Sequence, residues 1–421
     1  MTDRSLLDSR TVGPRFAPWL AKTNPFTSRN IAAASIPGLI NLSGGMPDPS
    51  LLPAQALSAI AAQAILDYPD DCLGYGPTPG LADLRETVAE RFRARGVPAK
   101  AENVLITASG TQALDLLGKI FTTPGDTIAC EIPSYAGAFD AWRPRNPTYR
   151  HLGLREGRDL AARMAGAAFT YMIPNFSNPT GYLVTLEERR KLLEAARASG
   201  TPLVEDDPYG ALFYDGEPLP TLLELASQGK DTLDDCPIIH LGSLSKQLAP
   251  GMRVGWIIAA PETIRMLSTA KQASDMCSNG LAQRMAVKAM QTGLIEDCHP
   301  RIIALYRARR NALCAAMARH IADYVTWEVP AGGMFVWANL LDTTVDVERL
   351  VDLGMQAGVL IGPGEPFDPL GLVPPAIRLS FTYCDEARLD QGMARLAQTF
   401  RTMGVQPGAR TYPATNPTLT S

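Results

Sequence analysis

The chain has 421 residues, 46% of them hydrophobic and 19% charged, and its 39 basic and 43 acidic residues leave a net charge of −4. This composition is typical of a globular protein with a sizeable core, and it excludes a strongly basic nucleic-acid-binding protein. No apolar run approaches the roughly 18 residues that a membrane-spanning helix needs, the N-terminal residues show no secretion signal, and the cysteines lack metal-site spacing. We therefore expect a cytoplasmic protein with reduced cysteines and no metal, nucleic-acid or membrane partner.

Residues 1–45 carry scattered Pro and Gly with little periodicity, which predicts an extended N-terminal arm that packs with the smaller domain described below. Residues 406–421 lack apolar periodicity and are expected to form a disordered tail. Between them, short segments are apolar at nearly every position, as strands buried on both faces of a sheet are. These predicted strands are residues 104–106, 127–130, 169–173, 202–204, 238–241 and 255–259.

Helical patterns separate these strands. Thr185 and Glu188 form a capping box that predicts the start of one helix, and Gly200 predicts its end. Alternating strands and helices predict an α/β fold with a mostly parallel sheet between helices. We expect residues 46–298 to form this large domain.

The pattern changes near residue 300. A long helical stretch over residues 301–321 is followed by strand-like segments, of which residues 376–381 are the last. These segments predict a smaller α+β domain over residues 299–405. The basic cluster of Arg307, Arg309 and Arg310 is expected on the solvated face of the long helix.

Ligands of open α/β sheets bind at the carboxyl ends of the strands, and several of these ends carry unusual residues. Residues 107–112 join a strand to a helix, where free backbone N–H groups can bind an anion, although an ordinary capped turn explains them as well. Residues 175–181 are either a simple turn or a place where the Asn178 amide reaches a ligand oxygen.

Two further strand ends carry charged residues. Glu205, Asp206 and Asp207 end a buried strand, where carboxylates are costly unless they are solvated or paired. Lys246 follows another buried strand among small hydroxyl residues, and Arg253 lies beyond a Pro-Gly turn. A lysine that is partly desolvated in such a place loses proton affinity, as a Schiff-base lysine must.

These segments resemble those of the pyridoxal-phosphate-dependent aminotransferases of class I/II, which have fold type I. The resemblance covers residues 42–404, and residues 243–255 carry its most specific motif. The other matching segments, in the family's order, are residues 73–80, 109–112, 178–181, 206–209, 330–335 and 377–380. The most similar branch contains kynurenine and 2-aminoadipate aminotransferases and the aminotransferase-like half of MocR-type regulators. The resemblance implies a large domain with a mostly parallel seven-stranded sheet and a smaller α+β domain.

By this resemblance, Lys246 would hold pyridoxal 5′-phosphate as an internal aldimine and later move the proton between substrate and cofactor. Asp206 would keep the ring nitrogen protonated, so that the ring can act as an electron sink. Tyr209 and Asn178 would hydrogen-bond the ring's phenolic oxygen, and Tyr135 would stack on the ring face.

The resemblance also implies a phosphate site, a substrate site and a homodimer with shared active sites. Tyr75 would reach the phosphate from the neighbouring subunit. Arg378, beside Asn178, would bind the substrate α-carboxylate as a bidentate fork. Gly44 and Gly45 would border the substrate pocket, where the backbone must approach closely. The residues that the resemblance assigns to the phosphate within one chain are Gly110, Thr111, Gln112, Ser243, Ser245 and Arg253.

The implied reaction moves an amino group from an L-amino acid to a 2-oxo acid, 2-oxoglutarate or pyruvate, by a ping-pong mechanism. Family members with acidic or kynurenine-type substrates often carry an Ile-Arg pair in the N-terminal arm. Here Thr27 aligns with that position and Arg29 lies nearby, so the side-chain specificity stays open.

Two alternatives remain at this point. One is another reaction of the same cofactor, such as elimination, cyclisation or oxidation, because the motifs indicate the cofactor and not the fate of the substrate. The other is a cofactor-sensing regulator, which we do not expect because about 40 residues before the first motif are too few for a DNA-binding domain.

Overall fold

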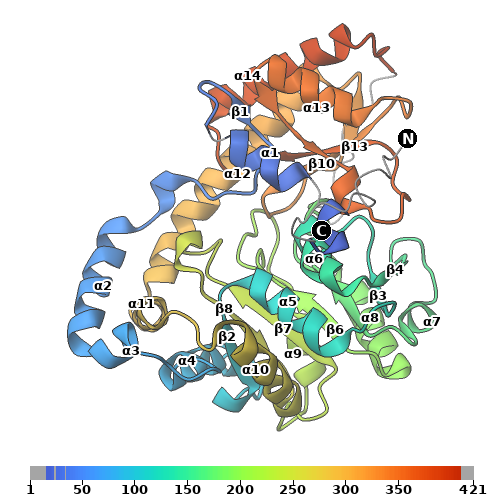
Figure 1. Ribbon diagram of the computed structural model, residues 1–421. Helices are drawn as coiled ribbons and strands as arrows, with labels where there is room; N and C mark the ends of the chain where they lie inside the picture. Colours follow the sequence, from blue (N-terminus) through green and yellow to red (C-terminus); the bar gives the residue numbers. More distant parts are fainter. Residues whose placement is uncertain (1–15, 23–24, 34, 409–421) are drawn as a thin grey trace, which may run out of the picture.

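The computed structural model describes residues 16–22, 25–33 and 35–408 of the 421-residue chain. A seven-stranded sheet forms its centre (Figure 1). Its strands are β2 (Val104–Thr107), β3 (Thr127–Cys130), β4 (Thr148–His151), β5 (Phe169–Met172), β6 (Leu203–Asp206), β7 (Ile238–Ser243) and β8 (Gly255–Ile258). Their order is β2-β8-β7-β6-β5-β3-β4, and β8 runs antiparallel to both neighbours whereas the other pairs are parallel.

This sheet confirms the predicted α/β fold. The predicted strands of the large domain are present, with ends shifted by at most a few residues, because strands buried on both faces have continuous apolar runs. The edge strand β4 was not predicted, since Thr148 is exposed and Arg150 is partly exposed, which breaks such a run.

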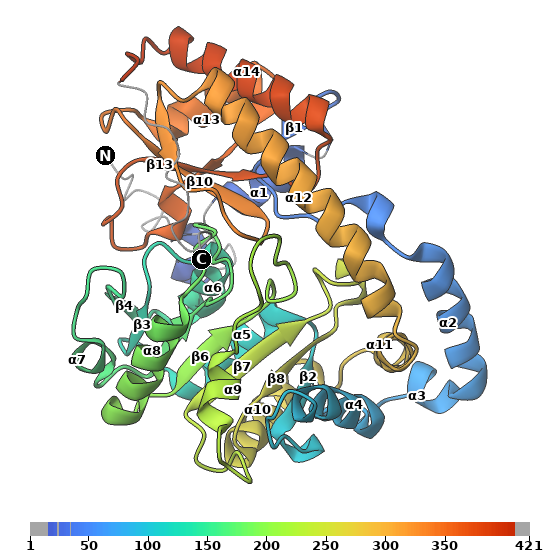
Figure 2. The ribbon, with the colours of Figure 1, turned by 180° about the vertical axis from the view of Figure 1, so that it is seen from behind.

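Helices cover both faces of the sheet (Figures 1 and 2). On one face lie α5 (Gly110–Phe121), α6 (Ala136–Trp142) and α10 (Pro261–Asp275). On the other lie α4 (Ala82–Arg93), α7 (Leu160–Met164), α8 (Leu186–Ser199) and α9 (Leu222–Ser227). Beside the sheet, α11 (Gly280–Gln291) packs against α2 (Ala54–Asp67) and α3 (Pro69–Leu73). The predicted capping box of Thr185 and Glu188 begins α8, and Gly200 ends that helix with a φ of 67°.

A smaller antiparallel sheet has the order β12-β13-β10-β9. Its strands are β9 (Val325–Trp327), β10 (Phe335–Leu340), β12 (Gly362–Pro363) and β13 (Ala376–Ser380), and its helices are α12 (Leu294–His320), α13 (Val347–Gln356) and α14 (Glu386–Thr402). The N-terminal arm joins this part of the molecule, because β1 (Ile40–Asn41) pairs in parallel with β11 (Val359–Leu360). The arm also contains α1 (Pro25–Ala33), where the sequence had predicted extended chain.

The long helix α12 connects the two parts (Figure 2). The predicted domain boundary after residue 298 falls inside α12 and stays a prediction. The predicted tail lies mostly outside the described residues, since only residues 406–408 of it are described.

The prediction of a solvated arginine face on α12 was wrong for two of its three residues. Arg309 is buried and pairs with Asp48 at 2.6 Å, and Arg310 is buried and pairs with Asp215. Arg310 also donates to the carbonyl of Pro330 at 2.8 Å. Because α12 runs between the two parts of the molecule, these arginines tie loops of both parts to one helix.

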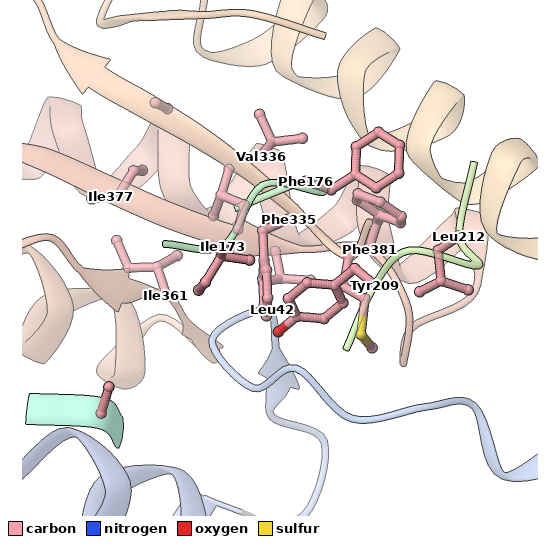
Figure 3. Close-up of a cluster of buried hydrophobic side chains, with 14 of the residues drawn as sticks. Leu42, Ile173, Phe176, Tyr209, Leu212, Phe335, Val336, Ile361, Ile377 and Phe381 are labelled. Atoms are coloured by element: carbon pink, nitrogen blue, oxygen red, sulfur yellow. The ribbon is translucent and has the colours of Figure 1, made fainter. Parts of the chain in front are cut away.

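An apolar cluster lies where the two sheets meet (Figure 3). Loops after β5 and β6 supply one side, and β10, β13 and the end of the arm supply the other. The labelled side chains include Leu42, Ile173, Phe176, Tyr209, Leu212, Phe335, Val336, Ile377 and Phe381. This packing fixes the loops that carry polar residues at the edge of the large sheet.

Among the residues that the structure describes, none of the helices combines the length and apolar character needed to cross a lipid bilayer. The cytoplasmic location stays a prediction.

Candidate active site

A cavity of about 340 Å³ lies at the carboxyl ends of β2, β5, β6 and β7, beside the smaller sheet. It brings together most of the predicted site residues, which come from segments far apart in the sequence. These are Gly44, Gly45, Gly110, Thr111, Tyr135, Asn178, Asp206, Tyr209, Ser243, Ser245, Lys246, Arg253 and Arg378.

Two predicted residues lie elsewhere. Tyr75 is 88% exposed in the single chain. The side chain of Gln112 turns away from the cavity, where it accepts a hydrogen bond from the Ala108 N–H and donates one to Asp275. The side chain of Thr27 is outside the described residues, so its predicted place in the specificity site is not described.

Lys246 follows β7 and points into the cavity, where its Nζ donates a hydrogen bond to the carbonyl of Gly45 at 2.8 Å. Burial, together with the positive charges of Arg378 and Arg253, lowers the pKa of Lys246 to about 8. An amine with a lowered pKa is unprotonated more often near neutral pH, which makes it a better nucleophile and base.

The three acids at the end of β6 separate by the alternation of side chains along a strand. Asp206 lines the cavity, and Glu205 points to the other face of the sheet, where it pairs with His240 at 3.0 Å. Asp207 accepts a hydrogen bond from Asn175 at 2.8 Å. Glu205 and Asp207 therefore each have their own hydrogen-bond partner, which offsets the free energy lost when a carboxylate leaves water.

Asp206 has a specific partner that sequence reasoning missed. The hydroxyl of Tyr171, on the neighbouring strand β5, donates to Asp206 Oδ2 at 2.7 Å. Burial raises the pKa of Asp206 to about 6, and the bond from Tyr171 acts in the opposite direction. A buried carboxylate beside a cavity is a suitable partner for a cationic N–H group of a ligand.

Hydrogen-bond donors gather at one end of the cavity, where α5 begins. Ser109 is the N-cap residue of this helix, with a φ of 73°, and its side chain makes no capping hydrogen bond. The first N–H groups of a helix have no intrahelical partner, so they can bind a ligand here. Arg253 donates to Ser109 Oγ, and Ser243 Oγ donates to Ser245 Oγ at 2.9 Å. A helix N-terminus beside an arginine and two hydroxyls is suited to a doubly charged anion. Ser109 was quoted within a motif but not predicted as a site residue.

Arg378 on β13 lies opposite, and its guanidinium is buried among aromatic rings. It donates to Asn178 Oδ1 at 2.6 Å and to the carbonyl of Ser43, and its Nε has no hydrogen-bond partner among the described residues. The rings of Phe26, Phe335 and Phe367 lie 5.2, 4.1 and 4.7 Å from the guanidinium carbon. Burial lowers the pKa of Arg378 to about 10, so it stays charged at neutral pH. A buried cation with an unused donor is suited to a carboxylate ligand.

The other residues that the resemblance places against the cofactor ring also line the cavity. Asn178 Nδ2 and the Tyr209 hydroxyl are 3.5 Å apart. The Tyr135 ring lies over Gly137, where a Cβ would come within 2.4 Å of its hydroxyl. Gly45 lies against Phe335, since a Cβ there would be 2.4 Å from the ring. The close approach of the Gly45 backbone to a substrate stays a prediction.

These groups match the parts of pyridoxal phosphate. A buried carboxylate suits the basic ring nitrogen, the cradle at α5 suits the phosphate, and an amine of lowered pKa suits the aldehyde. The cavity thus has the donor set that this cofactor requires.

Comparison with known proteins decides the family. A family model for aminotransferases of class I and II matches residues 37–396. The chain belongs to this family. It is a pyridoxal-phosphate-dependent aminotransferase, as the resemblance implied.

Relatives of this aminotransferase differ in the substrates that their names give. Aromatic-amino-acid aminotransferase 1 of Thermococcus litoralis is 36% identical over 375 residues, which cover 86% of this chain and 88% of the relative. The 2-aminoadipate transaminase of Thermus thermophilus is 35% identical over 371 residues, which cover 87% of this chain and 91% of the relative. The crystal structure of Pyrococcus horikoshii kynurenine aminotransferase in complex with PMP has a TM-score of 0.82 and 32% identity, covering 92% of this chain and 97% of that chain.

Proposed function

We propose that this aminotransferase transfers the amino group of an L-amino acid with an aromatic or other uncharged side chain to a 2-oxo acid. The observation that carries the proposal is the set of residues that line the cavity. Each basic side chain among them is assigned to the cofactor or to the substrate α-carboxylate, so none is left to bind an acidic substrate side chain. Lys246, Arg253 and Arg378 are the basic residues that line the cavity within the described chain. The rest of the substrate side is aromatic or amide in character, which suits an uncharged side chain.

Arg29, which the sequence left open as a specificity residue, supports this choice. Its guanidinium pairs with Glu348 at 2.5 Å and lies 3.7 Å from Asp352, both on α13. It is therefore engaged outside the cavity. From the same helix α1, Phe26 and Asn30 line the cavity instead.

Each cofactor contact is assigned to a group in the cavity. When bound, pyridoxal phosphate supplies an aldehyde that condenses with amines and a ring that delocalises the electron pair left at the substrate α-carbon. Lys246 Nζ would hold the cofactor and then carry the proton that leaves the α-carbon. Asp206, oriented by Tyr171, would hold the proton on the ring nitrogen. The turn at Ser109, together with Arg253, would bind the phosphate.

The remaining groups orient the substrate. Arg378 would bind the α-carboxylate with its free Nε and one further N–H, and Asn178 would hold Arg378 in place. Tyr135 and Tyr209 would border the ring. Amino acids and 2-oxo acids share this carboxylate, so one site can serve both half-reactions in turn, which is the basis of a ping-pong mechanism. The acceptor is proposed to be 2-oxoglutarate or pyruvate.

We propose a homodimer on the evidence of an exposed apolar surface formed by α2, α3 and the loops that follow α3 and α10. Leu66, Leu73, Tyr75 and Met276 are each more than half exposed. The first residue of α11 touches α3, since a Cβ on Gly280 would collide with the carbonyl of Asp71. Such contiguous apolar surfaces mark protein interfaces, and Tyr75 would reach the partner's phosphate from this one.

The donor preference is tested by mixing the holoenzyme with single amino acids and following the visible absorbance of the lysine-bound cofactor. L-phenylalanine and L-tyrosine should discharge it at lower concentrations than L-2-aminoadipate or L-aspartate, and adding 2-oxoglutarate or pyruvate should restore it. A lower half-saturating concentration for the acidic donors would contradict the proposal.

Matched variants sharpen this test. Asn30→Arg places a cation in the cavity and should raise the preference for 2-aminoadipate over phenylalanine by about tenfold or more. Arg29→Gln should leave that preference unchanged, because Arg29 contacts α13 and not the cavity. A loss of acidic-donor activity in Arg29→Gln would instead make Arg29 a substrate ligand.

A further inference from the structure

A fully buried lysine lies on α10, outside the cavity. Lys271 has 0% exposure, and its Nζ contacts Asp275 Oδ1 at 2.7 Å. Burying a lysine is costly even when it is paired, and an apolar residue of similar size is often at least as stable. The Asp275 side chain is 28% exposed, so the pair joins a buried ammonium to a carboxylate near the surface.

The second oxygen of this carboxylate links α10 to α5. Asp275 Oδ2 accepts a hydrogen bond from Gln112 Nε2 at 2.7 Å. The other end of the same amide, Gln112 Oε1, accepts a hydrogen bond from the backbone N–H of Ala108 at 2.8 Å. A continuous chain of hydrogen bonds therefore runs from Lys271 through Asp275 and Gln112 to the backbone just before Ser109.

Ser109 has an unfavourable backbone conformation, which neighbouring contacts must stabilise. Its φ of 73° lies in the left-handed region, which residues other than glycine adopt at a cost. Gln112 Oε1 holds the N–H of Ala108, one residue before Ser109, and Thr107 Oγ1 donates to the Ser109 carbonyl at 3.1 Å. This turn directs the first N–H groups of α5 toward the cavity.

We propose that Lys271 and Asp275, acting through Gln112, are positioning residues that hold the turn at Ser109 in its anion-binding shape. The inference rests on the proposed placement of the cofactor phosphate at this turn. The carboxylate gives Gln112 a strong charge-assisted acceptor. Lys271 neutralises that carboxylate, which would otherwise repel a phosphate dianion bound near the start of α5.

The test compares pyridoxal phosphate with pyridoxal, which lacks the phosphate, as ligands of the full-length apoenzyme. The double variant Lys271→Met with Asp275→Leu removes the pair without leaving one charge buried alone. It should weaken pyridoxal phosphate binding about tenfold, the loss expected for one hydrogen bond to a charged group, and change pyridoxal binding less than about twofold.

Gln112→Met should give a similar selective loss. Adding it to the double variant should cause little further loss, because groups that act in series are not additive. Binding of inorganic phosphate to the apoenzyme, measured by calorimetry, should weaken in the same variants.

The matched control is Lys119→Met. Lys119 joins Asp115 and Ser274, each at 2.7 Å, and so bridges the same two helices without touching the turn. This variant should bind both ligands as the wild type does. If the double variant fails to fold by circular dichroism, Gln112→Met alone, which leaves the ion pair of Lys271 and Asp275 intact, carries the test.

The outcomes separate this inference from the proposed function. Equal weakening of pyridoxal phosphate and pyridoxal would show a purely structural role and overturn the inference, as would no weakening of either ligand. A wild-type protein that bound the two ligands equally well would overturn the placement of the phosphate itself.

Discussion

The hydrogen bond from Tyr171 to Asp206 sets how readily this carboxylate loses its proton, and Tyr171→Phe removes that bond alone. The ring stays in place, since Trp142 packs edge-on against it with centroids 5.1 Å apart. A hydrogen bond to a charged group contributes about 1.5–3 kcal/mol, and about 1.4 kcal/mol corresponds to one pKa unit. The pKa of Asp206, about 6 in the wild-type protein, should therefore rise to about 7–8 in the variant.

This shift has a definite sign. Asp206 must be ionised to hold a protonated ring nitrogen, and it loses that form as the pH falls through its pKa. At pH 7 the ionised fraction in the apoprotein should fall from about 90% in the wild type to between about 50% and 10% in the variant. Cofactor binding should therefore be weaker in Tyr171→Phe near pH 7 and approach the wild-type affinity above about pH 9.

The assay is fluorescence titration of the apoenzyme with pyridoxal phosphate between pH 6 and pH 9. The control is Tyr149→Phe, which removes a hydroxyl from the edge strand β4, where the ring packs on Phe139. It should leave the profile unchanged. A Tyr171→Phe profile that coincided with the wild-type profile would refute the reasoning.

Three further predictions concern the groups around the cavity. The rate at which the apoenzyme takes up pyridoxal phosphate should rise with pH, reach half its maximum near pH 8 and level off above about pH 9, because only the unprotonated amine of Lys246 can react; a rate independent of pH between 6 and 9 would contradict this. Gly45→Ala places a Cβ 2.4 Å from the Phe335 ring and should raise the KM of the amino donor while cofactor affinity stays unchanged, as steady-state kinetics and titration would show. Arg378→Lys loses the planar fork that can donate two parallel hydrogen bonds to a carboxylate while it also bonds Asn178 and Ser43, so KM for donor and acceptor should both rise by about 10- to 100-fold; an effect on one substrate alone would argue against a shared carboxylate site.

Much of the site could be predicted because of a general property of parallel sheets. Asn178, Asp206 and Lys246 each follow an apolar strand, and the carboxyl ends of parallel strands meet at one edge. Polar residues that interrupt a buried pattern are conspicuous in a sequence. The same pattern predicted the strands themselves, and it failed at β4, where one face of the strand is open to solvent.

Other parts depend on contacts that no local pattern reveals. Tyr171 lies within a strand that reads as core, and its role depends on the register that pairs it with Val204 on β6. Gln112 belongs to a motif of the phosphate site, yet its position in the first turn of α5 directs its side chain to Asp275. Arg309 looks like a surface residue until α12 is seen to run between the two parts of the molecule.

Lys246 is expected to hold pyridoxal phosphate covalently. Reduction of the holoenzyme with borohydride, followed by digestion and peptide mass spectrometry, tests it most directly. A phosphopyridoxyl group is expected on the peptide that contains Lys246, and none on any peptide of Lys246→Ala. A reduced wild-type protein without this label, or with the label on a different lysine, would contradict it.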